Sequence, residues 1–75
     1  GYAEAWFRLG RMVETGQSTA VNLEAAYQLY LGASEKGFSE AKPMAESVAR
    51  RLTPAAVKAV EKSFKASPDQ LPKLR

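Results

Sequence analysis

Apolar residues recur at helical spacing from the start of the chain. In residues 3–15 they fall on one face of a helix with 3.6 residues per turn, at Ala5, Trp6, Leu9, Met12 and Val13. The polar residues of the same segment fall on the opposite face, at Glu4, Arg8, Arg11 and Thr15. Glu4 precedes Arg8 by one turn, in the favourable order for an ion pair. The pattern predicts an amphipathic helix over 3–15.

A second helix is predicted over 23–36, with recognisable signals at both ends. Gly16 can end the first helix in a left-handed conformation, and Asn22 can accept a hydrogen bond from an amide of the next first turn. Gly37 ends the second helix in the same way as Gly16. Leu29 widens an apolar stripe formed by Leu23, Ala26, Tyr27, Tyr30, Ala33 and Ser34.

Two further helices are predicted, over 40–51 and 54–66. Ser39 is the expected cap of the third. Pro43 is compatible with a first turn but disruptive further in, so the regular helix is expected to begin either at residue 40 or only near Lys42. Its stripe consists of Ala41, Met44, Ala45, Val48, Ala49 and Leu52. Thr53-Pro54 is a strong start signal for the fourth, whose inward residues are Ala56, Val57, Val60 and Phe64. No segment alternates as a strand does, so we expect an all-α protein of about four helices in antiparallel pairs.

The domain organisation predicted from this pattern is a helical domain over 1–66 and a tail over 67–75. Ser67-Pro68-Asp69 ends the fourth helix. The tail either stays disordered or places Leu71 and Leu74 over the fourth helix, and the sequence leaves both open.

The composition removes the usual reactive groups. The 75 residues include no cysteine and no histidine, so there is no disulfide, no thiolate and no imidazole base or ligand. The carboxylates are scattered on solvent faces, and no serine has a visible base to activate it. We therefore expect no enzyme activity and no catalytic, cofactor or metal site. No apolar run is long enough to span a bilayer, and the compartment stays open.

Charge is distributed unevenly around a net value of +3. Residues 1–37 carry three basic and four acidic residues, whereas residues 38–75 carry eight basic and four acidic residues. Lys58, Lys62 and Lys65 form a row on the fourth predicted helix. The alternative function is therefore a small basic DNA-binding domain, with the third and fourth helices as a helix-turn-helix. The tight turn without glycine and the lack of Asn, Gln or Arg for base contacts on that helix weigh against it.

A shift of 36 residues overlays Ala5 on Ala41, Leu9 on Ala45 and Met12 on Val48, and helix pairs at such a period are typical of solenoids. Residues 5–41 also resemble a Sel-one-like repeat, a tetratricopeptide-type helical repeat. The matching positions are Ala5, Leu9, Gly10, Gly16, Asn22, Ala26, Tyr30, Ala33, Gly37 and Ala41. In the second unit Ala45-Glu46 replaces the family's Leu-Gly and the loop shrinks to about Leu52-Thr53. The second unit is interpreted as a degenerate capping repeat over about 38–66, which follows a first repeat over about 3–37.

The resemblance implies a short α-solenoid that serves as a protein-protein interaction scaffold or adaptor, within a larger, often bacterial, protein. An N-terminal Gly-Tyr leading straight into a helix also suggests a fragment with upstream repeats. In such solenoids the first helix of each pair lines the ligand groove, which makes Phe7, Arg8, Arg11, Glu46 and Arg50 the candidate partner-binding residues. Ordinary solvated charges, and core or repeat packing for Phe7, explain the same residues without a ligand. A purely structural capping role is a third possibility.

The small residues have a physical explanation that is independent of the family. Gly10 within a helix costs about 1 kcal/mol relative to alanine. Neighbouring backbones can approach closely where side chains lack bulk, at Ala5, Gly10, Ala26, Ala33 and Ala41. We expect Trp6, Tyr27 and Tyr30 to fill the wider spaces between the helices.

Overall fold

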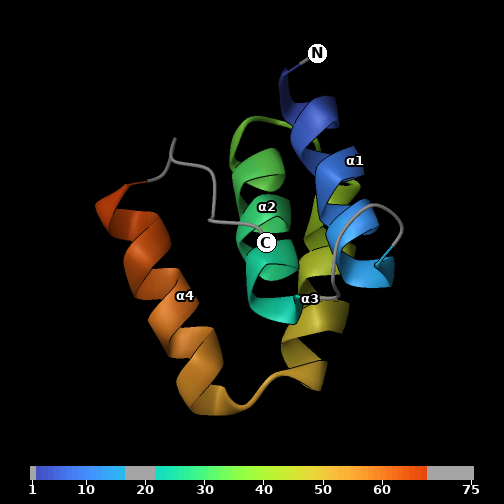
Figure 1. Ribbon diagram of the computed structural model, residues 1–75. Coiled ribbons are helices and arrows are strands. Elements are labelled where there is room, and N and C mark those ends of the chain that lie inside the picture. The colour runs from blue at the N-terminus through green and yellow to red at the C-terminus, as the bar shows by residue number, and fades with distance from the viewer. Residues whose placement is uncertain (1, 17–21, 68–75) are drawn as a thin grey trace.

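A computed structural model describes residues 2–16 and 22–67, and in this part of the chain four helices and no strands are present (Figure 1). The helices are α1 (Tyr2–Thr15), α2 (Leu23–Glu35), α3 (Ala41–Arg51) and α4 (Pro54–Ala66). The expected all-α class is confirmed, and each helix begins and ends within about one residue of its predicted bounds. The predicted tail lies outside the described residues apart from Ser67.

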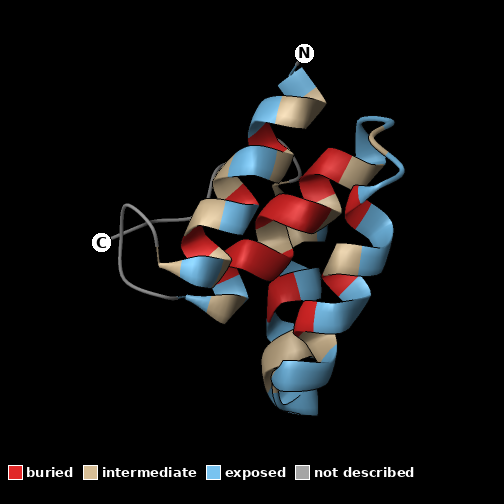
Figure 2. Cartoon of the chain, turned by 90° about the vertical axis from the view of Figure 1, so that its right-hand side faces the viewer, coloured by how far each residue is buried: buried red, intermediate tan, exposed pale blue. Residues whose placement is uncertain are grey.

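Helix α2 is the centre of the structure. It packs against α1, α3 and α4, whereas no comparable packing joins α3 to α4. More of its residues are buried than in any other helix, as the red ribbon in Figure 2 illustrates. The buried residues of α2 are Ala25, Ala26, Tyr27, Leu29, Tyr30, Gly32 and Ala33. A helix buried on several sides in this way organises the packing of the other three.

Helices α1 and α3 run in the same direction on one side of α2. Glu14 near the end of α1 forms an ion pair with Arg51 at the end of α3. Phe7, in the first half of α1, packs against Phe38, just before α3 begins. Since α2 connects α1 to α3, it runs antiparallel to both (Figure 1). This packing of helix pairs is consistent with a small helical solenoid.

The second helix pair is more open than the first. Figure 1 shows α4 diverging from α3 after the short connection at Leu52 and Thr53. Val60 is the buried residue of α4 within the described part of the chain, while Val57 is half-buried against the core. The second pair is therefore held mainly through α2.

Two of the three predicted helix caps are confirmed. Asn22 Oδ1 accepts a hydrogen bond from the Ala25 amide at 3.1 Å, and Thr53 Oγ1 accepts one from the Ala56 amide at 3.2 Å. Each bond satisfies an amide that the first helical turn leaves without a partner.

The prediction that Ser39 caps α3 is wrong. Residue Glu40 occupies the cap position with a helical backbone and makes no side-chain capping bond. The first amides of α3 bond instead to backbone carbonyls, Ala41 to Phe38 and Lys42 to Ser39. Because these backbone carbonyls already accept hydrogen bonds from the first amides of α3, the Ser39 hydroxyl is not needed as a cap.

Gly37 turns the chain from α2 towards α3 with a φ of 101°. The Gly37 amide bonds to the Ser34 carbonyl and the Phe38 amide to the Ala33 carbonyl, which is a Schellman motif. An added Cβ at Gly37 would meet nothing within 4 Å, so glycine serves here for its backbone conformation rather than for space. The turn delivers Phe38 back onto the core beside Phe7.

Two glycines allow α1 to approach α2 closely. A Cβ at Gly10 would lie 2.8 Å from Cε1 of Tyr30, and a Cβ at Gly32 would lie 2.0 Å from Cζ3 of Trp6. The rings therefore occupy the space that a side chain would fill, as expected for Trp6 and Tyr30. Ala26, Ala33 and Ala41 are fully buried.

The expectation for Ala5 is wrong, since the structure places Ala5 on the exposed side of α1. The buried residues of α1 are Trp6, Gly10 and Val13; Trp6 and Val13 belong to the predicted stripe, and its members Leu9 and Met12 are half-buried. The close approach at Gly10 rotates α1 so that Ala5 turns away from α2.

Candidate functional site

The buried tyrosines of α2 use their hydroxyl groups to hold the other helices. The Tyr30 hydroxyl donates to Glu14 Oε1 at 2.6 Å, and Arg51 Nη1 donates to Glu14 Oε2 at 2.9 Å. These contacts tie α1, α2 and α3 together at one point. Burial of the ring, followed by the bond to Glu14, raises the pKa of Tyr30. The phenol therefore stays protonated and acts as a hydrogen-bond donor.

A second tyrosine links α2 to α4. The Tyr27 hydroxyl donates to Glu61 Oε2 at 2.9 Å. Burial first, and then the bond and the negative charge of Glu61, raise the pKa of Tyr27 to about 12. Neither tyrosine is placed as an acid or base at neutral pH, and both have a structural role.

Among the candidate partner-binding residues, Phe7 lies at the edge of the core. Its ring centroid is 4.9 Å from that of Phe38 and 5.7 Å from that of Tyr30. The tilted rings at these separations are a favourable aromatic arrangement. Phe7 is half-buried within this chain, which agrees with the packing interpretation rather than with a free anchor.

The charged candidates lie on two helices. Arg8 on α1 is exposed and donates to Glu4 at 2.7 Å, which confirms the expected pair, and Arg11 is exposed on the same helix. Glu46 and Arg50 are both exposed on α3, and the structure shows no ion pair between these two described residues. Isolated exposed pairs contribute little to stability, so these groups are available for a partner without loss of the fold.

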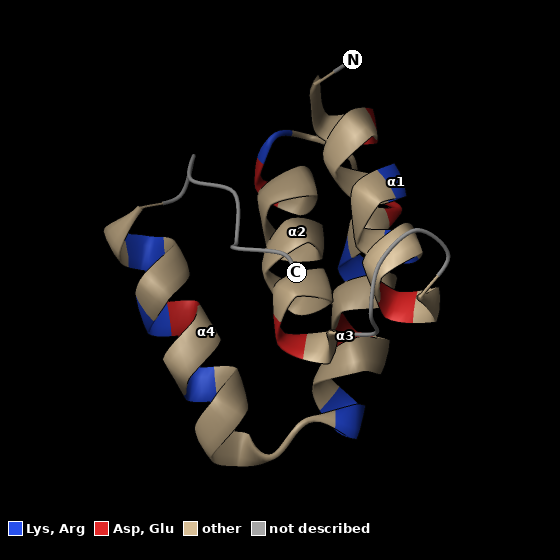
Figure 3. Ribbon diagram, viewed as in Figure 1, with Lys and Arg blue, Asp and Glu red and all other residues tan. Residues whose placement is uncertain are grey.

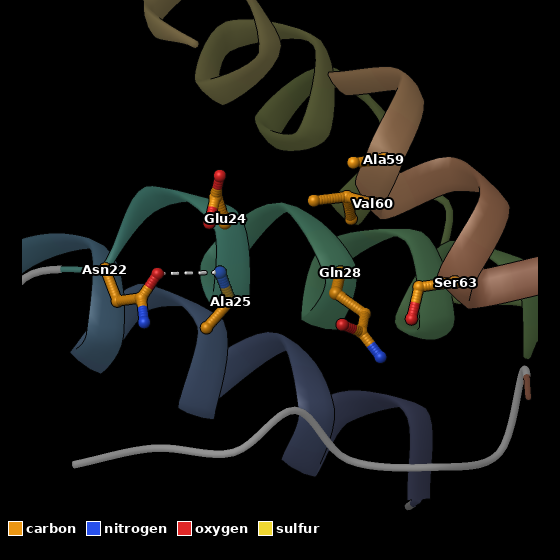
Figure 4. A pocket seen from close by; sticks show the side chains of 7 residues that line it. All are labelled: Asn22, Glu24, Ala25, Gln28, Ala59, Val60 and Ser63. Atoms are coloured by element: carbon orange, nitrogen blue, oxygen red, sulfur yellow. Dashed lines mark hydrogen bonds between the residues drawn. The ribbon is translucent and has the colours of Figure 1, made fainter. Parts of the chain in front are cut away.

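A polar hollow of about 230 Å³ lies between parts of α2 and α4 (Figure 4). Its lining residues are Asn22, Glu24, Ala25, Gln28, Ala59, Val60 and Ser63. Asn22 is already engaged in capping α2, as the dashed line in the figure marks. Glu24 is the one charged group of this lining, and no arrangement of nucleophile, base and orienting group is present in it.

A second hollow, named here the α2–α3 groove, is more apolar. Its volume is about 270 Å³, and it is lined by Tyr27, Leu31, Ser34, Lys42, Ala45, Glu46 and Ala49. Tyr27, Leu31 and Ser34 come from α2 and the other four residues from α3, and Glu61 of α4 contacts this lining through its hydrogen bond with Tyr27. Glu46, one of the candidate partner-binding residues, lies in the lining of this groove.

Basic side chains follow α4 on its exposed surface. Lys58, Lys62 and Lys65 are all exposed, and Figure 3 shows the corresponding positions along the helix. Lys58 and Lys65 stand three residues before and four residues after Glu61, so the three share one face of α4. Since Glu61 bonds to Tyr27, which lines the α2–α3 groove, Lys58 and Lys65 lie about one helical turn from a residue that contacts this lining.

The described residues contain no group of three or more carboxylates that could hold a metal ion. No helix in 2–16 or 22–67 is both long and apolar enough to cross a membrane. Every buried side-chain polar atom of this part of the chain has a hydrogen-bond partner. The chain matches no family model, no curated protein and no solved structure.

Sequence reasoning missed Gly32 and the partners of the tyrosines. Gly32 stands at the closest approach of α1, but a glycine near a helix end gives no signal of a tryptophan on another helix. Glu14 and Glu61 are 16 and 34 residues away from their tyrosines, so no local pattern connects them. The one usable signal was the tyrosine itself, because a buried phenol requires a polar partner.

Proposed function

We propose that this chain is a non-enzymatic interaction module, a scaffold or adaptor of the Sel-one-like repeat type within a larger bacterial protein. One observation carries the proposal. No polar or charged residue is buried in the described part of the chain, and the hydroxyls of Tyr27 and Tyr30 are engaged in holding helices together. Groups available for contact therefore lie at the surface, where they favour recognition over chemistry.

The proposed binding surface includes the exposed charges of α1 and α3. Arg8 and Arg11 follow one another along α1, and Arg50 is exposed on α3. Arginine is enriched at the energetic centres of protein interfaces because its planar group makes several hydrogen bonds at once. The proposed partners are a protein or peptide and, within the same chain, upstream repeats.

Panning a display library of random peptides against the immobilised chain tests this function. We expect enriched peptides that share a sequence pattern and bind the purified chain. The affinity of these peptides should fall for the Arg8→Glu/Arg11→Glu/Arg50→Glu variant or for a variant of another described surface. The control is an unrelated helical protein of similar size in which the same number of charges is reversed, panned with the same library. If no peptide is enriched above that control, the proposed function is wrong.

The exposed lysines of α4 keep DNA binding as a second candidate. A duplex of random sequence, titrated at an ionic strength of about 0.01 M, tests it directly, because phosphate contacts strengthen as salt falls. We expect background binding only, since α4 offers lysines but no residue suited to reading bases. Tight binding that weakens steeply with salt would favour the DNA-binding alternative.

A further inference from the structure

The α2–α3 groove has a largely apolar lining to which the neighbouring helix α4 contributes no residue. Leu31 is half-buried at the floor, and Ala45 and Ala49 form the wall on α3. In a closed helix pair the second helix would pack on this wall. Here α4 packs on α2 instead, without comparable packing on α3, which leaves the groove open.

The size of the groove restricts its occupant. Pockets for cofactors and drug-sized ligands have volumes of about 300–1,000 Å³. The groove offers about 270 Å³ and is lined largely by small and apolar side chains. It therefore suits a few apolar side chains projecting from a larger partner, in the manner of an amphipathic helix laid into a hydrophobic groove.

The charges around the groove indicate the sign of the charge that the partner carries beside its apolar stripe. Lys42 lies in its lining, and Lys58 and Lys65 lie about one turn before and after Glu61 on α4. The acidic groups at the same place are Glu46 and Glu61, and Glu61 already accepts a hydrogen bond from Tyr27. The balance is basic, so acidic flanks on a partner are complementary to it.

We infer that the α2–α3 groove binds the apolar stripe of an acidic amphipathic helix from another protein. This inference rests on the proposed function and adds the place and the partner's chemistry to it. The apolar side chains of the partner enter between α2 and α3, over Leu31 and Ala49. Its carboxylates lie along Lys42 on one side and Lys58 and Lys65 on the other.

A designed peptide tests the inference. The probe is a fluorescently labelled helix of about 18 residues, because isolated helices shorter than about 12–15 residues are marginal in water. It carries leucines at positions i, i+3, i+4 and i+7 and glutamates on its flanks. The comparison peptide carries lysines in place of the glutamates. Affinity is measured by anisotropy, and amide chemical shifts locate the bound peptide.

We expect the acidic peptide to bind at least about tenfold more tightly than the basic one at low ionic strength. The preference should shrink when ionic strength rises from about 0.01 M to about 0.15 M, since the Debye length falls from about 30 Å to about 8 Å. Shift changes should gather at Leu31, Ser34, Ala45 and Ala49. Equal affinity for the two peptides would contradict the inference.

Three variants locate the binding. Ala49→Trp fills the groove and should abolish binding, whereas the control Ala5→Trp adds the same bulk on the exposed side of α1 and should leave it unchanged. Lys58→Glu/Lys65→Glu should weaken binding of the acidic peptide at least about tenfold. Its control is the basic comparison peptide, whose affinity for the same variant should not fall. The effect of Lys58→Glu/Lys65→Glu tests the inference even if Ala49→Trp does not fold.

The remaining outcomes separate this inference from the proposed function. If an Arg8→Glu/Arg11→Glu variant alone loses the peptide, the groove is excluded while protein binding stands. If neither peptide binds, the acidic-helix inference is wrong, and the display experiment decides the proposed function independently. If sedimentation shows that the chain associates with itself and Ala49→Trp makes it monomeric, the occupant is a second copy and the inference is wrong.

Discussion

Replacing Gly32 with alanine tests the packing of α1 on α2 most sharply. The new Cβ would lie 2.0 Å from Cζ3 and 2.2 Å from Cε3 of Trp6. The indole cannot easily move away, because it is 4% exposed and the Lys36 ammonium group lies 5.3 Å from its ring centroid. The substitution therefore forces either the ring or the whole of α1 to shift.

Two opposing effects set the magnitude. Alanine is favoured over glycine within a helix by about 1 kcal/mol. Overpacking a well-filled core costs about 1–3 kcal/mol, and an overlap with a nearly buried ring belongs at the upper end of that range. We expect Gly32→Ala to reduce the free energy of unfolding by about 1–2 kcal/mol. In a small domain with about 3–5 kcal/mol of net stability this is a large fraction.

The assay is urea unfolding followed by far-UV circular dichroism, with Trp6→Leu as the second mutation of a double-mutant cycle. A shorter side chain at position 6 removes the atoms that the new Cβ would meet. In the Trp6→Leu background, Gly32→Ala should therefore stabilise the protein by up to about 1 kcal/mol, through helix propensity alone. The sign of the effect should reverse between the two backgrounds.

Two results would refute this reasoning. One is stabilisation by Gly32→Ala in the wild-type background, which would mean that Trp6 is not packed against that position. The other is an equal loss in both backgrounds, which would mean that the cost does not come from contact with the indole.

Three further substitutions probe other parts of the fold. Gly10→Ala should destabilise the protein by about 1 kcal/mol, because the new Cβ would lie 2.8 Å from the buried Tyr30 ring, and a gain in the urea midpoint would contradict this. Thr53→Ala should cost about 1 kcal/mol through loss of the α4 cap, whereas Thr53→Ser should cost little. The pKa of Tyr27 is raised from 10.0 to about 12 in the folded protein. This shift stabilises the folded state, and the stabilisation is complete below pH 10 and lost as pH rises through about 12. The urea midpoint should therefore fall more between pH 10 and 12 in the wild type than in Tyr27→Phe, and identical profiles would exclude this contribution.

Local signals were sufficient to predict the helices and most of their ends. Asn22 and Thr53 act within their own first turns, and the left-handed glycines Gly16 and Gly37 end α1 and α2 where expected. Such features depend on residues a few positions apart and are visible in sequence. The prediction that Ser39 caps α3 was wrong because the carbonyls of a preceding turn satisfy the amides that its hydroxyl would have bonded.

Contacts between helices could not be predicted in the same way. The helical pattern of α1 allowed Ala5 in the buried stripe, and only the approach of Gly10 to Tyr30 decides that Ala5 faces solvent. The bonds from Tyr27 to Glu61 and from Tyr30 to Glu14 join helices that are far apart in sequence. The opening between α3 and α4, and with it the groove, also depends on how each helix packs on α2.

Amide hydrogen exchange measured residue by residue shows whether α2 is the most stable helix while α4 is held lightly and leaves a groove for a partner. We expect the slowest exchange in α2, at amides such as Leu29, Tyr30 and Ala33, whose side chains are fully buried. We expect clearly faster exchange along α4, where Val60 is the buried residue of the described segment. Protection in α4 equal to or greater than that in α2 would show that α4 is not held lightly.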